Sequence, residues 1–141
     1  PQSVTFESNS FTGYKIYEGS HNGYNNKFNR IIKRKLKVSE NENKLFGEDS
    51  IINTKNVESK IIYHIRFHLA TGLIYNFTNN KKNIILRSNL KNMWLFKSDN
   101  ELVVEDSIIV DKNITLPTKQ IVIKGITNNN KIIRKWSLEK I

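Results

Sequence analysis

Apolar and polar residues alternate along most of the chain, and apolar residues at helical spacing are hard to find. Alternation of this kind places the two sets of side chains on opposite faces of a strand, which is typical of a half-buried β-sheet. The alternating segments are separated by polar stretches such as Asn79 to Lys82 and Asn128 to Asn130, whose residue types favour turns. The sequence therefore predicts an all-β chain.

Strands of this length, punctuated this regularly, favour an antiparallel two-sheet β-sandwich. A chain of 141 residues has the length of one domain, so we expect residues 1–141 to form a single β-sandwich domain. Both prolines, Pro1 and Pro117, are expected outside strand interiors. The predicted strands are Ser3 to Glu7, Tyr14 to Gly19, Asn29 to Ser39, Lys44 to Ile52, Ser59 to Leu69, Leu73 to Thr78, Asn83 to Ser88, Met93 to Lys97, Glu101 to Val110, Lys119 to Ile126 and Lys131 to Glu139.

Positive charge is the main compositional feature: 23 Lys and Arg against 13 Asp and Glu give a formal net charge of +10. Such a surface favours polyanions, whether nucleic acid, anionic lipid or acidic polysaccharide. Alternatively, the abundance of Lys, Ile and Asn beside a single alanine, Ala70, reflects an AT-rich genome that places lysine at solvated positions. Without an apolar run near the ~18 residues that a membrane span needs, no membrane partner is expected.

The segment from Ile61 to Leu69 is the most informative stretch of the sequence. Alternation predicts a core face and a polar face, and neighbours on the polar face lie about 7 Å apart. That row suits the successive polar groups of an extended polymer, or a set of side chains that satisfy one another or water. The core face holds Tyr63, Ile65, Phe67 and Leu69, and the other face holds Ile62, His64, Arg66 and His68.

Lys33, Lys35 and Lys37 form a second basic stripe, opposite the apolar residues of the same predicted strand, and we interpret it as a solvated face. A different kind of candidate is the glycine-bearing segment GYKIYEGSHNGYNNKF, which carries several tyrosines around His21. Aromatic rings in a polar loop are a common way to hold a sugar. The same loop is also compatible with an ordered turn whose tyrosine hydroxyls bond to backbone groups.

Complete catalytic or metal-binding constellations are missing from the sequence. There are no cysteines, and His64 and His68 would lie ~13 Å apart on a strand, so they cannot share a metal ion. Glu48 and Asp49 are neighbours on a strand and point to opposite faces, which makes them a poor acid and base pair. We therefore assign no catalytic residue and expect no metal and no cofactor. Nucleic acid is not expected as a partner, because no stacking platform or recognition helix is evident.

Several short segments nevertheless occur in a recognisable order: SHNGYNNKF, RKLKVSENENKLFGEDSI, IRFHLATGL, MWLF, LVVEDSI, KQIVIKG and KWSLEK. Together they resemble the C-terminal β-domain of bacterial heparinase II/III-like proteins, over roughly His21 to Ile141. Three departures from the family pattern stand out: Asn22 replaces the usual Asp, Ile32 stands where many members have His, and Ala70-Thr71 replaces His-Pro.

This resemblance implies part of a polysaccharide lyase, in which an N-terminal α/α-toroid packs on a β-sandwich. The implied reaction is β-elimination: a uronate carboxylate is neutralised, a base removes the adjacent proton, and an acid protonates the departing oxygen. In the family, the toroid and an earlier histidine motif supply these groups, so we expect this chain to be inactive alone and to provide cleft wall and support. The resemblance also suggests a periplasmic or secreted location. A non-catalytic module that binds acidic glycans is the alternative.

On this basis the site residues are assigned in two groups. Substrate binding is assigned to His21, Tyr24, Arg66 and His68, with acidic polysaccharide as the ligand. A structural polar network is assigned to Arg34 and Glu48, and Glu48 is the expected ionic partner of Arg34 or of Arg66, because an inward guanidinium needs a carboxylate partner.

Overall fold

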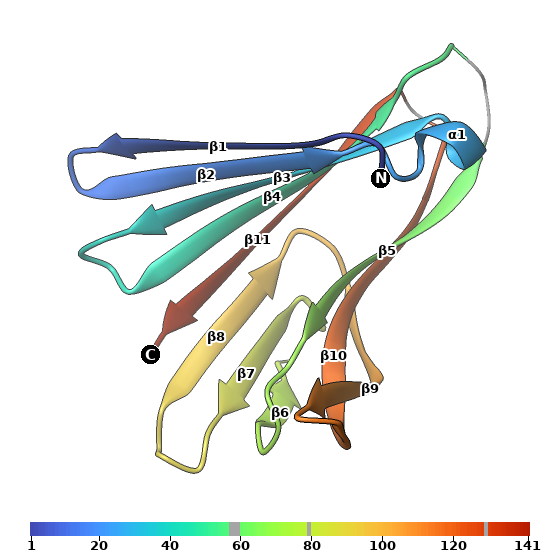
Figure 1. The fold of residues 1–141 in the computed structure, drawn as a ribbon. Helices are drawn as coiled ribbons and strands as arrows, with labels where there is room; N and C mark the ends of the chain where they lie inside the picture. Colours follow the sequence, from blue (N-terminus) through green and yellow to red (C-terminus); the bar gives the residue numbers. More distant parts are fainter. Residues whose placement is uncertain (57–59, 79, 129) are drawn as a thin grey trace.

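The computed structural model describes residues 1–56, 60–78, 80–128 and 130–141, and in these ranges it consists of antiparallel strands and one short helix (Figure 1). No helix among them has the length and apolar character needed to span a membrane. The elements are β1 (Val4–Phe11), β2 (Tyr14–His21), α1 (Asn25–Phe28), β3 (Arg30–Ser39), β4 (Lys44–Asn53), β5 (Ile61–His68), β6 (Ile74–Phe77), β7 (Asn83–Arg87), β8 (Met93–Ser98), β9 (Leu102–Asp111), β10 (Ile114–Thr127) and β11 (Lys131–Lys140).

The strands form two sheets, which confirms the predicted all-β sandwich. The large sheet has the order β1-β2-β3-β4-β11-β8-β7-β6, and the small sheet has the order β5-β10-β9. Local backbone geometry explains the hairpins: Gly13 adopts a φ of 83° between β1 and β2. Lys112 and Asn113, at φ of 45° and 67°, give the β9–β10 hairpin the two positive φ values of a type I′ turn.

The hydrophobic core lies between the two sheets, as the alternation predicts. Tyr63 and Ile65 of β5 point into it and are 7% and 9% exposed, while Ile62, the residue before Tyr63 and on the opposite face, is 72% exposed. An aromatic cluster joins the layers, because the ring of Phe67 from the small sheet lies 4.7 Å from Trp136 and 5.0 Å from Phe96 of the large sheet. We call the face of the large sheet that meets this core its inner face.

The large sheet extends well beyond the small one on the side of β1 and β2 (Figure 1). Every residue of β1 is exposed, including Val4 and Phe6, which lie on the inner face and are each 69% exposed. Among the described residues, β5 pairs only with β10. The inner face of the extension and this unpaired edge of β5 therefore border an open space, which contains the candidate site.

Pro117 departs from the expectation that both prolines avoid strand interiors. It lies inside β10, opposite Ile108 of β9. The pairing of β10 with β5 begins only at Gln120, opposite His68, so Pro117 needs no N–H for a second neighbour. Two other differences are the short helix α1, which alternation did not predict, and the longer strands β1 and β10. The predicted strand start at Ser59 falls outside the described residues.

Candidate functional site

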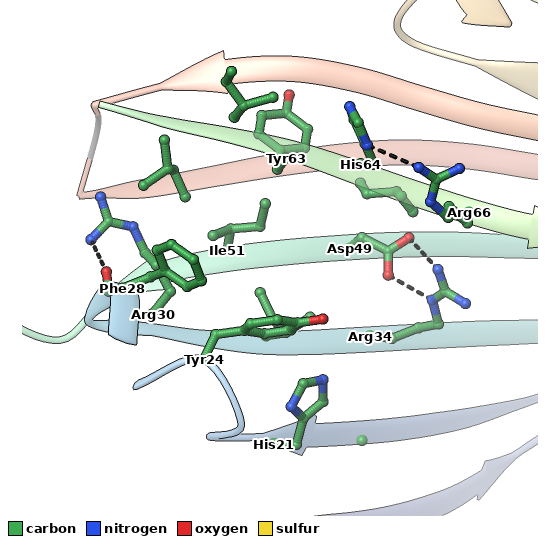
Figure 2. Close-up of a pocket in the computed structure, with 15 residues that line it drawn as sticks. His21, Tyr24, Phe28, Arg30, Arg34, Asp49, Ile51, Tyr63, His64 and Arg66 are labelled. Atoms are coloured by element: carbon green, nitrogen blue, oxygen red, sulfur yellow. Dashed lines mark hydrogen bonds and ion pairs between the residues drawn. The ribbon is translucent and has the colours of Figure 1, made fainter. Parts of the chain in front are cut away.

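A cleft of about 670 Å³ opens between the inner face of β2, β3 and β4 and the edge of β5. Figure 2 shows His21 and Tyr24 on one side of it, and His64 and Arg66 on the other. Gly19 also lines the cleft, and a Cβ there would meet only the carbonyl oxygen of Thr5, at 3.7 Å. The cleft is lined by Gly19, His21, Tyr24, Phe28, Arg30, Ile32, Arg34, Asp49, Ile51 and residues 61–66.

The chain between β2 and β3 presents His21 and Tyr24 to this cleft. The backbone N–H of Gly23 donates to Nδ1 of His21 over 3.2 Å. A neutral imidazole that accepts at Nδ1 carries its proton on Nε2, so His21 offers an N–H donor. The Tyr24 ring lies 5.6 Å from the imidazole, tilted by 50°, and is half exposed. Together they form a donor beside an aromatic surface.

Arg30 holds the segment between β2 and β3 in place through hydrogen bonds. Its side chain is 1% exposed, and Nη1 donates to the carbonyl oxygens of Phe28 and Asn29 and to Oδ1 of Asn53. Asn29 takes the left-handed conformation that ends α1, with φ of 52°. A buried guanidinium thus holds the helix end against β4, and this fixes the backbone that carries Tyr24.

Arg34 is held by Asp49, which corrects the predicted pairing with Glu48. Nε and Nη2 of Arg34 donate to the two carboxylate oxygens over 2.6 and 3.0 Å, and Trp136 donates its indole N–H to the same group over 2.8 Å. Asp49 is 4% exposed. Glu48 cannot take this place because neighbouring residues of a strand point to opposite faces; it lies on the outer face, opposite Lys35 and Lys135.

Arg66 of β5 joins the cleft to a polar network on the outside of the small sheet. It donates to Glu105 over 2.8 Å, which makes Glu105 rather than Glu48 its carboxylate, and Lys124 also pairs with Glu105. Nη2 of Arg66 lies 3.0 Å from Nδ1 of His64. A guanidinium can only donate, so His64 accepts at Nδ1 and carries its proton on Nε2.

The structure brings three of the four predicted binding residues to one cleft. His21, Tyr24 and Arg66 line it, whereas His68 does not. Nδ1 of His68 bonds to the hydroxyl of Ser107 over 2.8 Å, on the outer face of the small sheet. Adjacent same-face residues of a strand are about 7 Å apart, which carries His68 beyond the end of the cleft.

Glu105 gives the network a pH dependence that can be measured. Hydrogen bonds from Lys124 and Arg66 lower the pKa of Glu105 from 4.5 to about 2. A lowered folded-state pKa stabilises the fold above the unfolded value, so this contribution is lost as the pH falls from about 4.5 to about 2. We expect Glu105→Gln to flatten the pH dependence of the urea midpoint in that window. Glu101→Gln, which removes a carboxylate without an ion pair among the described residues, serves as the control and should keep the wild-type slope.

The cleft is electropositive. Its described lining contains three arginines and one carboxylate, Asp49, which is bonded to Arg34 and Trp136; Glu105, the partner of Arg66, lies outside the lining. Arg34 and Arg66 remain 40% and 37% exposed despite their ion pairs. Guanidinium groups bind carboxylate and sulfate-like oxygens through paired N–H donors, so this arrangement suits an anionic ligand. Within the described ranges, no group of three or more histidine or carboxylate side chains is placed to hold a metal ion.

Comparison with known protein families agrees with the resemblance seen in the motifs. The family model described as "Heparinase II/III-like, C-terminal" matches residues 1–137. The chain belongs to this family. The match begins at residue 1, so this heparinase II/III-like domain includes β1 and β2 as well as the segment after His21. No curated protein matches the chain by sequence at a significant level.

Solved structures share the fold of this heparinase II/III-like domain at low sequence identity. The heparan sulfate lyase HepC mutant from Pedobacter heparinus aligns with a TM-score of 0.77 and 10% identity, over 97% of this chain and 21% of its own. A heparinase III, the BT4657 gene product, aligns at 0.79 and 6%, over 98% and 21%. Another heparinase III aligns at 0.78 and 9%, over 99% and 21%. The chain thus spans about a fifth of the length of these proteins.

Several cleft residues were missed or misassigned by sequence reasoning. Arg30 and Arg34 stand out only as two of the few arginines in a lysine-rich chain. The role of Asp49 could have been found from the alternation of β4. Gly47, Asp49 and Ile51 are two residues apart, so they share the inward face of the strand. His64 was placed correctly on the polar row, but its contact with the cleft depends on how the two sheets stack.

Proposed function

We propose that this domain forms one wall of the substrate cleft of a lyase that acts on uronate-containing acidic polysaccharides. The observation that carries the proposal is the electropositive cleft, whose lining combines the partly exposed arginines Arg34 and Arg66 with the Nε2–H donor of His21 and the ring of Tyr24. Neighbours named as heparan sulfate lyase and heparinase III support the choice of substrate class.

In the proposed role the domain binds and orients the polymer. The guanidinium groups attract the carboxylate and sulfate oxygens, the Tyr24 ring provides an apolar surface for a sugar ring, and His21 donates to a hydroxyl or ring oxygen. The groups that remove the proton and protonate the departing oxygen come from an N-terminal α/α-toroid of the same protein. In this scheme the 141-residue chain binds the substrate, and it does not catalyse the reaction by itself.

Binding at the cleft is tested by an NMR titration with a heparin hexasaccharide, read from the backbone amide signals of Gly23 and Tyr24. We expect Arg66→Gln to raise the Kd reported by these signals by about tenfold, because it removes a charged hydrogen-bonding group worth about 1.5 kcal/mol. His21→Ala should raise it about threefold. Lys82→Gln, which removes an exposed charge outside the cleft lining, is the matched control and should change it less than about twofold.

Turnover separates the supporting role from a complete active site. The isolated chain is incubated with heparin, heparan sulfate and alginate while the ultraviolet absorbance of the unsaturated product is followed. No increase is expected, and steady turnover would contradict the supporting role.

A non-catalytic module that binds acidic glycans remains the second candidate, because the same electropositive cleft would serve it. The coding DNA upstream of Pro1 distinguishes the two. An open frame for a helical toroid supports the lyase, whereas a start codon close to Pro1 supports the module.

A further inference from the structure

The outer face of the large sheet, which points away from the cleft, carries a group of lysines from neighbouring strands. Alternation places Lys35 and Lys37 on this face of β3, and the strand register adds Lys135 from β11. Lys35 lies opposite Glu48 on β4, and Glu48 lies opposite Lys135. The ammonium-bearing side chains therefore start about 7 Å apart along β3 and about 10 Å apart across two strand spacings.

These three lysines differ from Lys33, Lys44 and Lys97 on the same face by their lack of ion-pair partners. Lys33 pairs with Glu18, and both Lys44 and Lys97 pair with Glu139 at 3.1 Å. In the part of the chain that the structure describes, no carboxylate oxygen lies within 4.0 Å of the ammonium groups of Lys35, Lys37 or Lys135, and all three residues are exposed. Two carboxylates flank Lys35 in register, Glu48 on β4 and Glu18 on β2. Glu18 already pairs with Lys33, so the three lysines and Glu48 keep a net positive charge.

The cluster borders a shallow hollow of about 360 Å³ with a partly apolar lining. Phe46, 38% exposed, and Ile16 contribute the apolar part. A sugar ring presents C–H groups on its faces and polar groups at its edge. An apolar patch ringed by ammonium groups fits a sugar that carries carboxylate or sulfate substituents. The full lining is Ile16, Lys35, Lys37, Phe46, Gly47, Glu48, Lys135 and Trp136.

The aromatic rings around this hollow are poorly placed for stacking on nucleic-acid bases. The ammonium group of Lys37 lies 4.3 Å from the ring centroid of Tyr14, and Phe11 stacks on the same ring at 4.9 Å. The ammonium group of Lys44 lies 4.7 Å from the ring centroid of Phe46. Single-stranded nucleic acid is usually held by open aromatic platforms on which successive bases stack. The chemistry favours a glycan polyanion over a nucleic acid.

We infer that this hollow, which we call the outer lysine site, binds a second segment of anionic polysaccharide, independently of the cleft. The choice of a polysaccharide as the polyanion rests on the proposed function. Because the two sites lie on opposite faces of one sheet, a short oligosaccharide fills each separately, and a long polymer gains affinity by engaging both.

The test is an NMR titration of the 141-residue chain with a heparin hexasaccharide, in which each site has its own reporters. Amide signals of Phe46 and Gly47, which the variants leave unchanged, report the outer lysine site, and those of Gly23 and Tyr24 report the cleft. We expect the triple variant K35Q/K37Q/K135Q to weaken binding at the outer reporters more than tenfold and to leave the cleft Kd within about twofold. The slope of log Kd against log salt at the outer site should fall by about two to three, one for each lost contact.

A control triple variant, K55Q/K82Q/K140Q, removes the same charge from exposed positions outside both linings, and it should leave both Kd values within about twofold. Thermal unfolding of each variant checks that the fold is intact.

Outer reporters that do not shift with the hexasaccharide, or that keep their Kd in the K35Q/K37Q/K135Q variant, would overturn the inference. Equal or tighter binding of a dT oligonucleotide at the same reporters would overturn the assignment to a glycan. Failure of the proposed function would give a different result: the amide signals of Gly23 and Tyr24 would not shift with the hexasaccharide, while the outer reporters would still shift.

Discussion

Replacing Gly47 with alanine is expected to destabilise the fold by about 3 kcal/mol or more, which corresponds to a fall in Tm of roughly 10 °C for a domain of this size. A Cβ at this position would overlap the indole ring of Trp136. The ring cannot move aside easily, because its N–H is bonded to Asp49 and its faces and edges contact Phe67 and Phe96. Thermal and urea unfolding measure the loss.

Gly19→Ala is the matched control for this substitution. Gly19 also lies on the inner face of the large sheet, but a Cβ there meets only the Thr5 carbonyl oxygen at an ordinary 3.7 Å. Its backbone φ is not positive, so alanine introduces no strain. We expect its stability to stay within about 0.5 kcal/mol of the wild type. Equal stability of Gly47→Ala and Gly19→Ala would contradict the tight packing of Trp136 on β4.

Asp49→Ala is expected to cost about 3 kcal/mol. The substitution leaves the buried indole N–H of Trp136 without an acceptor, and it strips the Arg34 guanidinium of both its carboxylate bonds. Arg34 also lies over Phe67 and Trp136, 5.1 and 5.6 Å from their ring centroids, so its displacement disturbs the aromatic cluster. Urea unfolding with constant m-value would assign the loss to the folded state.

Glu48→Ala tests the same strand one residue away. Glu48 points to the outer face and makes no ion pair with Arg34, so we expect a change within about 0.5 kcal/mol. A large loss in Glu48→Ala together with a small one in Asp49→Ala would restore the pairing predicted from sequence and refute the one in the structure.

Much of the sheet architecture was predictable from local pattern. The alternation over β5 correctly separated Tyr63 and Ile65 from His64 and Arg66, because a strand turns successive side chains to opposite faces whatever its partners are. Turn-forming residues marked most strand ends within a few positions. Pro117 was misjudged, because only the register with β5 shows that its backbone N–H position has no second strand to serve.

The candidate site was less predictable, because its contacts join residues far apart in sequence. His21 and Tyr24 were chosen as a glycan-binding loop, and they do line the cleft, but His68 was grouped with Arg66 and lies outside it. Glu48 was predicted to pair with Arg34 or Arg66, but these arginines bond to Asp49 and Glu105. Alternation along β4 places Asp49, and not Glu48, on the inward face.

The sequence by itself determined the fold class, the strand segments and which residues share a face, since these follow from local alternation and turn chemistry. It also carried the family, through motifs whose order does not depend on geometry. Only the tertiary structure decided which carboxylate meets which arginine, that the large sheet extends beyond the small one, and that an electropositive cleft lies beneath that extension. Those outcomes depend on strand order, register and the stacking of two sheets, which are set by long-range packing.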